Sequence, residues 1–240
     1  MRLADAARFE RGSIVWFFRL FGAALVANVA TELCSGAWRV HSGELFPWRH
    51  LPIVPLYPPA MLAVEWIVSA AAGFALVVGV KRALAIRIAA AVILVGLSQR
   101  YSNHGALLFL VALFVSLAPP DVTASDFETR DQPNLMLVRA QLVIVYVFSA
   151  ANKLAHPFAS GAALEHLLGI SHASAKPLAW MVIAAELALP VLLVTRPRLG
   201  IVAALALHAV FAATMPGLWS FGLVMLAMAA LFVAPPPVGR

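Results

Sequence analysis

The sequence predicts an all-α fold, a polytopic integral membrane helix bundle of about eight transmembrane helices, with seven remaining possible. Of the 240 residues, 62% are hydrophobic and only 12% are charged. The mean hydropathy is +0.91, whereas soluble domains contain about 45–50% apolar and about 25% charged residues. Apolar stretches recur along the whole chain with short polar breaks, so we expect residues 1–240 to form a single domain.

Each apolar stretch is long enough for a helix that crosses most of the membrane, since a helix rises 1.5 Å per residue and the apolar core is about 30 Å thick. The expected helices cover residues 14–36, 58–80, 83–99, 105–118, 136–154, 178–195, 199–215 and 220–234. The third, fourth and eighth are short, so some of them are expected to be tilted pairs or partial crossings.

Three segments are not expected to span the membrane. The prolines of segment 40–59 would leave backbone groups unpaired in lipid, so we expect this segment at an interface. The acidic loop 119–134 and the segment 156–177 are the other two.

The basic residues indicate the orientation of the bundle. Counting Lys and Arg near the helix ends places eleven on one side and five on the other, which favours both termini in the cytoplasm, N-in and C-in. The net charge of +6 follows from this topology, because the basic residues are scattered and form no nucleic-acid-binding run. We expect a bacterial inner-membrane protein that keeps its N-terminal apolar stretch as an anchor. The single cysteine, Cys34, excludes an internal disulfide.

Several ionisable groups lie within the predicted spans, where each costs roughly 2.5–3.5 kcal/mol and by default marks an interior cavity or a functional site. They are Glu32, Glu65, Lys153, Glu186 and His208, with Arg100, Asn103 and His104 at a short turn. With the N-terminus inside, almost all of them fall in the outer third of the membrane. A cavity that opens toward the periplasm would collect them.

Each of these residues also has a simpler interpretation. Glu32 and Arg100 lie near helix ends and can reach water. Glu65 and Glu186 are deeper, so pairing with Lys153, Arg100 or His208 is the expected alternative. His208 can be a hydrogen-bonded core histidine, and Asn103 and His104 can cap a helix. Trp38, Trp48, Trp66, Trp180 and Trp219 read mostly as interface anchors. The histidines lack tight ligand spacing, so no metal is expected.

Three stretches, residues 139–164, 99–119 and 207–232, resemble the membrane domain of vitamin K-dependent gamma-carboxylase and its bacterial relatives, the HTTM (horizontally transferred transmembrane) proteins. The most specific positions are Arg139, Gln141, Tyr146, Ala150, Ala151, Lys153, Leu154 and Gly161.

The resemblance implies a carboxylase- or epoxidase-like enzyme that uses a vitamin K-like hydroquinone or another quinol. Lys153 would be the catalytic base, and His104 and His208 would complete the catalytic set. Glu32, Glu65, Arg100, Asn103, Tyr146, Asn152 and Glu186 would line the cavity. Asn152 departs from the second lysine that often precedes the catalytic one. The chain has no counterpart of the large lumenal domain, so processive carboxylation of a protein is not expected.

Three functions stay open at this stage. The first is a small membrane enzyme that acts on a quinol or another lipophilic substrate. The second is a non-catalytic subunit or assembly partner of a membrane or periplasmic protein, which the small size and the many small-residue helix faces favour. The third is a transporter of a small solute that uses the buried Glu and His residues as a proton relay.

Overall fold

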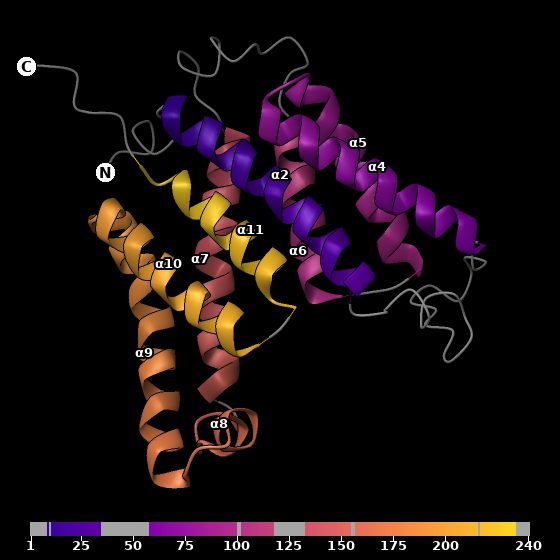
Figure 1. Ribbon diagram of the computed structural model, residues 1–240. Coiled ribbons are helices and arrows are strands. Elements are labelled where there is room, and N and C mark those ends of the chain that lie inside the picture. The colour runs from indigo at the N-terminus through magenta and orange to yellow at the C-terminus, as the bar shows by residue number, and fades with distance from the viewer. Residues whose placement is uncertain are drawn as a thin grey trace, which may run out of the picture.

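The computed structural model describes residues 9, 11–34, 58–99, 102–117, 133–154, 157–215 and 217–233, and all regular structure in these ranges is helical. The helices, labelled as in Figure 1, are α2 (Arg11–Cys34), α4 (Pro59–Val78), α5 (Arg82–Gln99), α6 (Asn103–Ser116), α7 (Pro133–Leu154), α8 (Ala162–Leu168), α9 (His172–Thr195), α10 (Pro197–Thr214) and α11 (Trp219–Ala230). Six of them are long and apolar enough to cross a membrane, and α6 and α11 are shorter apolar helices. The chain is a polytopic helical membrane protein.

Each predicted stretch corresponds to one helix, and no predicted end differs from the observed end by more than six residues. The largest difference is at the start of α9, which begins at His172 rather than at residue 178. The segment 156–177 therefore contains α8 and the first turns of α9. Segment 40–59, apart from its last two residues, and residues 119–132 of the acidic loop lie outside the described residues.

A small separate core explains why α9 begins early, although Pro177 lies inside the helix. Ala175 and Ala179 on α9 are fully buried and pack with Leu164 on α8. The turn before α8 depends on Gly161, which has a φ of +88°. A Cβ atom at Gly161 would lie 2.6 Å from the backbone nitrogen of Lys176, so only glycine fits between α8 and α9.

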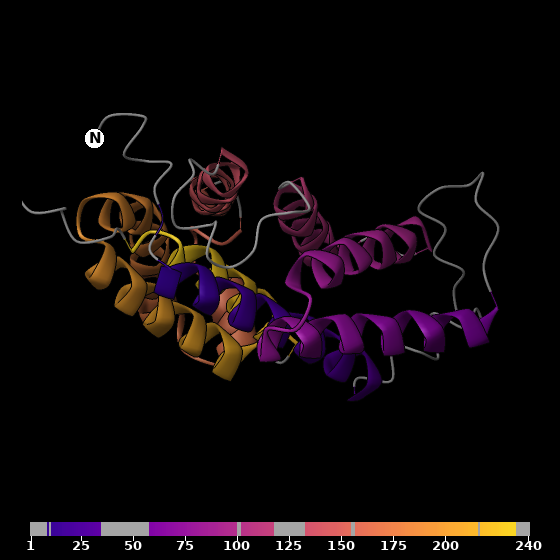
Figure 2. The same ribbon diagram turned by 90° about the horizontal axis from the view of Figure 1, so that it is seen from above.

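Helix α11 occupies the centre of the bundle. Figure 2 shows α9 and α10 at one end of the molecule and α4 and α5 at the other, with α2 and α11 between them. Helix α11 packs against α2, α10 and α7, and most of its residues are buried, including Met225 and Met228. Helix α11 has only 12 residues, but it contacts helices at both ends of the molecule and is covered mainly by protein.

Helices α2 and α4 cross at two glycines. A Cβ atom at Gly73 would lie 2.7 Å from the carbonyl oxygen of Gly22 and 3.0 Å from Leu25 Cβ. Small residues let helix backbones approach closely in a membrane, where lipid supplies no hydrophobic drive for helix association. The close contact of α2 and α4 therefore depends on glycine at both positions.

Arg139 ties the start of α7 to the end of α11. Its guanidinium group donates two hydrogen bonds to the carbonyl oxygen of Leu231, and the bond from Nε is 2.8 Å long. The same group lies 4.0 Å from the ring centroid of Phe9 and 5.5 Å from that of Phe232. A cation at a helix C-terminus satisfies carbonyls that have no partner within the helix, so Arg139 has a structural role here.

Candidate functional site

Helix α7 carries three polar side chains of its second half on one face. Tyr146, Ser149 and Lys153 are separated by three and four residues, the spacing that places side chains one above another on a helix. Arg139 lies seven residues before Tyr146 and continues the same face toward the other end of the helix. The apolar helix therefore directs a line of polar groups at the neighbouring helices of the bundle.

Lys153 forms an ion pair with Glu186 of α9. Its Nζ atom donates to Glu186 Oε1 at 2.7 Å and to Oε2 at 2.8 Å, and a third bond of 2.6 Å reaches Ser149 Oγ. Ser149 in turn donates to Glu186 Oε1 at 3.2 Å. The Glu186 side chain is 4% exposed, whereas that of Lys153 is 22% exposed. This confirms the expected pairing of Glu186, and it directs the Lys153 ammonium protons at fixed acceptors.

Tyr146 and His208 form the next contact along α7. The Tyr146 hydroxyl lies 2.9 Å from His208 Nε2, and both side chains are buried. The imidazole ring packs edge-on against Phe211 and Phe221. Its Nδ1 atom has no hydrogen-bond partner among the described residues. Because Tyr146 and Lys153 lie seven residues apart on the same face of α7, the two contacts are neighbours in the bundle. We call Tyr146, Ser149, Lys153, Glu186 and His208 the α7 polar cluster.

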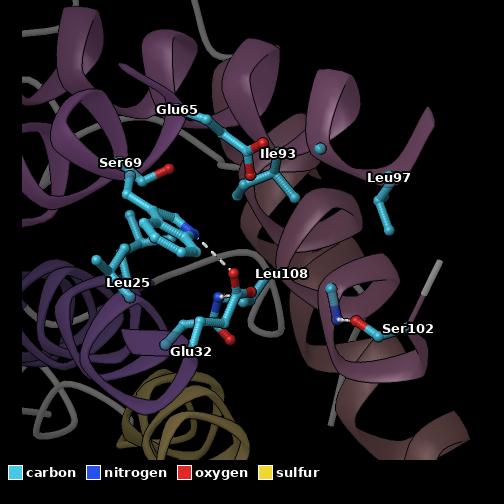
Figure 3. Close-up of a pocket in the computed structure, with 13 residues that line it drawn as sticks. Leu25, Glu32, Glu65, Ser69, Ile93, Leu97, Ser102 and Leu108 are labelled. Carbon is cyan, nitrogen blue, oxygen red and sulfur yellow. Dashed lines mark hydrogen bonds between the residues drawn. The ribbon is translucent and has the colours of Figure 1, made fainter. Parts of the chain in front are cut away.

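A second group of polar side chains lies on the α2 side of the bundle. Glu32 accepts a 2.7 Å hydrogen bond from the indole nitrogen of Trp66 and a 3.1 Å bond from Asn28. Figure 3 shows the carboxylates of Glu32, from α2, and Glu65, from α4, beside the same pocket. We call Asn28, Glu32, Glu65 and Trp66 the Glu32 cluster. Glycine at position 96 makes room for Glu65, because a Cβ atom there would lie 2.5 Å from Glu65 Oε1.

A small cavity adjoins the Glu32 cluster. Its lining includes Glu32, Glu65, Trp66, Ser69 and Ser102, and it offers about 40 Å³ to the centres of water molecules. A buried water needs about 10–15 Å³ of such space, so the cavity has room for about three waters. Pockets for drug-sized ligands measure about 300–1,000 Å³. The cavity therefore suits water or a small ion rather than a quinol.

The expected site residues fall into separate places. Lys153, Glu186, Tyr146 and His208 meet in the α7 polar cluster, whereas Glu32 and Glu65 line the cavity on the other side of α11. His104 is partly buried, and the hydrogen bonds of Lys153 and His208 among the described residues do not involve it. Asn103 and Asn152 are exposed, and Arg100 lies outside the described residues. The structure thus places six of the expected residues in two clusters and leaves His104, Asn103 and Asn152 outside both.

The sequence interpretation missed the partners that complete both clusters. Ser149 bonds to Lys153 and Glu186, and its position four residues before Lys153 on one helix was the available signal. The sequence predicts Trp66 as an interface anchor, whereas in the structure its indole donates to Glu32 across 34 residues of sequence. No local pattern indicates that bond. The proposed capping role near Asn103 belongs to Ser102, whose hydroxyl accepts from Gly105 N at 3.1 Å.

The chain is similar to a known protein family over part of its length. Residues 132–226, from just before α7 into α11, match the family described as methylamine utilisation protein MauE. The expected resemblance to HTTM proteins and gamma-carboxylase is therefore wrong, because the family model that matches the Lys153 segment is a different one. A Lys and a Tyr at helical spacing suit many buried polar clusters, so the motif was less specific than it looked. Neither curated proteins nor solved structures gave a significant match.

Proposed function

We propose that this integral membrane protein is an accessory component of methylamine utilisation that acts with partner proteins and does not itself transform a substrate. The proposal draws on the similarity of residues 132–226 to methylamine utilisation protein MauE. This segment contains α7 to α10 and the first part of α11, so it includes every member of the α7 polar cluster. We therefore propose that residues 132–226 carry the function of the protein.

The observation that carries the proposal is the closed hydrogen bonding of Lys153. All three acceptors of its ammonium group, Glu186 Oε1, Glu186 Oε2 and Ser149 Oγ, come from the protein itself. A lysine ammonium has three donors and no acceptor. The nitrogen is thus engaged as a cation, which suits a binding or structural role better than proton abstraction from a substrate.

Growth of the native host tests the proposed function. Deleting the gene should abolish or slow growth on methylamine as the nitrogen source and leave growth on ammonium unchanged. The wild-type gene should restore growth, Glu186→Gln should fail to do so at equal membrane abundance, and Lys176→Ala should succeed, because Lys176 is an exposed lysine outside the cluster. A host that does not use methylamine, or a deletion strain that grows on it at the normal rate, would contradict the proposal.

Purification tests the accessory role separately. The chain purified from the native host in mild detergent should retain a protein partner in constant ratio, and the chain alone should leave methylamine unchanged. Turnover of methylamine by the isolated chain would show that the protein is an enzyme.

A further inference from the structure

The ammonium group of Lys153 is itself a small alkylammonium ion attached to the protein. Its last carbon and its nitrogen have the chemistry of methylammonium, with three N–H donors. Both oxygens of Glu186 and Ser149 Oγ accept at 2.6–2.8 Å, so acceptors match donors one for one. The Phe158 ring centroid lies 5.6 Å from the nitrogen, within the range of a cation–π contact.

The two members of the ion pair differ in how easily they can move away. The Lys153 side chain is 22% exposed and belongs to the last turn of α7. A lysine at a helix end can extend its flexible stem and place its ammonium in water. Glu186 is 4% exposed in the middle of α9, so its carboxylate cannot follow. If Lys153 turns outward, the acceptors stay in place and need another cation, because a buried charge without a partner is strongly unfavourable.

We propose that Glu186, Ser149 and Phe158 form a binding site for a small primary alkylammonium ion, which Lys153 occupies when that ion is absent. The choice of methylammonium as the first ion to test rests on the proposed function. An incoming ion takes the place of the Lys153 ammonium, so Glu186 is neutralised in both states. The exchange involves no covalent change.

The geometry also defines the selectivity of the site. A primary ammonium supplies the three N–H donors that the acceptors match, whereas tetramethylammonium supplies none. The ring of Phe158 favours an organic cation over a strongly hydrated metal ion. Methylammonium and ethylammonium should therefore compete with each other, and tetramethylammonium and sodium should not.

Equilibrium binding to the purified full-length protein in lipid nanodiscs tests the site, with ¹³C-methylammonium observed by NMR at constant ionic strength. Wild-type protein should bind the ion saturably, and ethylammonium should displace it. Glu186→Gln should abolish binding, and Ser149→Ala should weaken it about tenfold because one acceptor is lost. Lys153→Ala should bind at least tenfold more tightly because the competing cation is gone. Lys176→Ala should bind as the wild type does.

Two results would overturn the inference: wild-type protein that binds no methylammonium saturably, or Glu186→Gln protein that binds it as tightly as the wild type. If Lys153→Ala does not fold, the wild-type and Ser149→Ala measurements decide alone. Binding and growth are independent readouts. Absent binding with lost growth on methylamine rejects the site and keeps the proposed function, whereas binding with normal growth does the opposite.

Discussion

Two acidic residues, Glu186 of α9 and Glu32 of α2, are accommodated in different ways in the two ends of this molecule. Glu186 is almost fully buried and faces the cation of Lys153 at 2.7 Å, without bordering the cavity described above. Glu32 accepts bonds from the neutral donors Trp66 and Asn28 and borders that cavity. A buried carboxylate is tolerated in a membrane protein when a counter-ion or when donors and water satisfy it. Glu186 is thus held by an ion pair with a lysine, whereas Glu32 accepts hydrogen bonds from Trp66 and Asn28 beside a small cavity.

The largest effect should come from breaking the ion pair. Lys153→Ala leaves Glu186 without the cation that it faces, and removing one partner of a buried pair costs about 3–5 kcal/mol. Glu186→Ala should cost less, because Lys153 can reach water. Both losses are measured as changes in the free energy of unfolding in mixed micelles, without amine in the buffer. The double variant Lys153→Ala/Glu186→Ala should lose less stability than the two single variants lose together. A loss below about 1 kcal/mol for Lys153→Ala would mean that water already solvates Glu186.

The α2 end depends on close contact between α2 and α4. Gly73→Ala would place a Cβ atom 2.7 Å from the Gly22 oxygen, so α2 and α4 must separate. We expect a loss of about 2 kcal/mol in the free energy of unfolding. Gly222→Ala is the matched control, because a Cβ there would meet His208 Cβ at an ordinary 3.5 Å. The control should be neutral or slightly stabilising, since alanine favours the helix. Equal losses for both variants would contradict the expected difference in packing.

Removing the indole donor tests the Glu32 cluster. Trp66→Phe keeps an aromatic ring and deletes the 2.7 Å bond to Glu32. Hydrogen bonds to a charged group contribute about 1.5–3 kcal/mol, and water in the adjoining cavity should replace part of the loss. We expect Trp66→Phe to lower the free energy of unfolding by about 1.5 kcal/mol, measured by thermal or denaturant unfolding. Trp180→Phe is the control, because Trp180 is 49% exposed. A Trp66→Phe loss as large as that of Lys153→Ala would remove the distinction between the two ends.

The smallest effect should follow Tyr146→Phe, which deletes the 2.9 Å contact with His208 and preserves the ring. Side-chain hydrogen bonds between membrane helices contribute about 0.6 kcal/mol on average. The same variant should leave methylammonium binding within about twofold of wild type, because Tyr146 does not contact the Lys153 ammonium. A loss of binding would extend the site to His208, and unfolding measurements on the same preparation would separate that result from a loss of stability.

The sequence predicted the helices because membrane helices must be long and apolar to satisfy their backbone groups in lipid. It also predicted that Glu186 pairs with Lys153, Arg100 or His208, and the structure shows that Lys153 is a partner. It did not predict the early start of α9, which depends on the fit of Gly161 against α9. The Trp66–Glu32 bond was also missed, because it joins two helices whose relative rotation no local pattern specifies. The orientation in the membrane stays a prediction.

By itself the sequence determined that this chain is a helical membrane protein and which of its residues carry charge into the bilayer. Those properties follow from composition and spacing, which act locally along one helix. Only the tertiary structure decided that Lys153 and Glu186 meet in one cluster while Glu32 and Glu65 line a cavity on the other side of α11. The reason is that side-chain partners across a bundle depend on how helices rotate and cross, and contacts such as that of Gly22 with Gly73 set those rotations over long sequence distances.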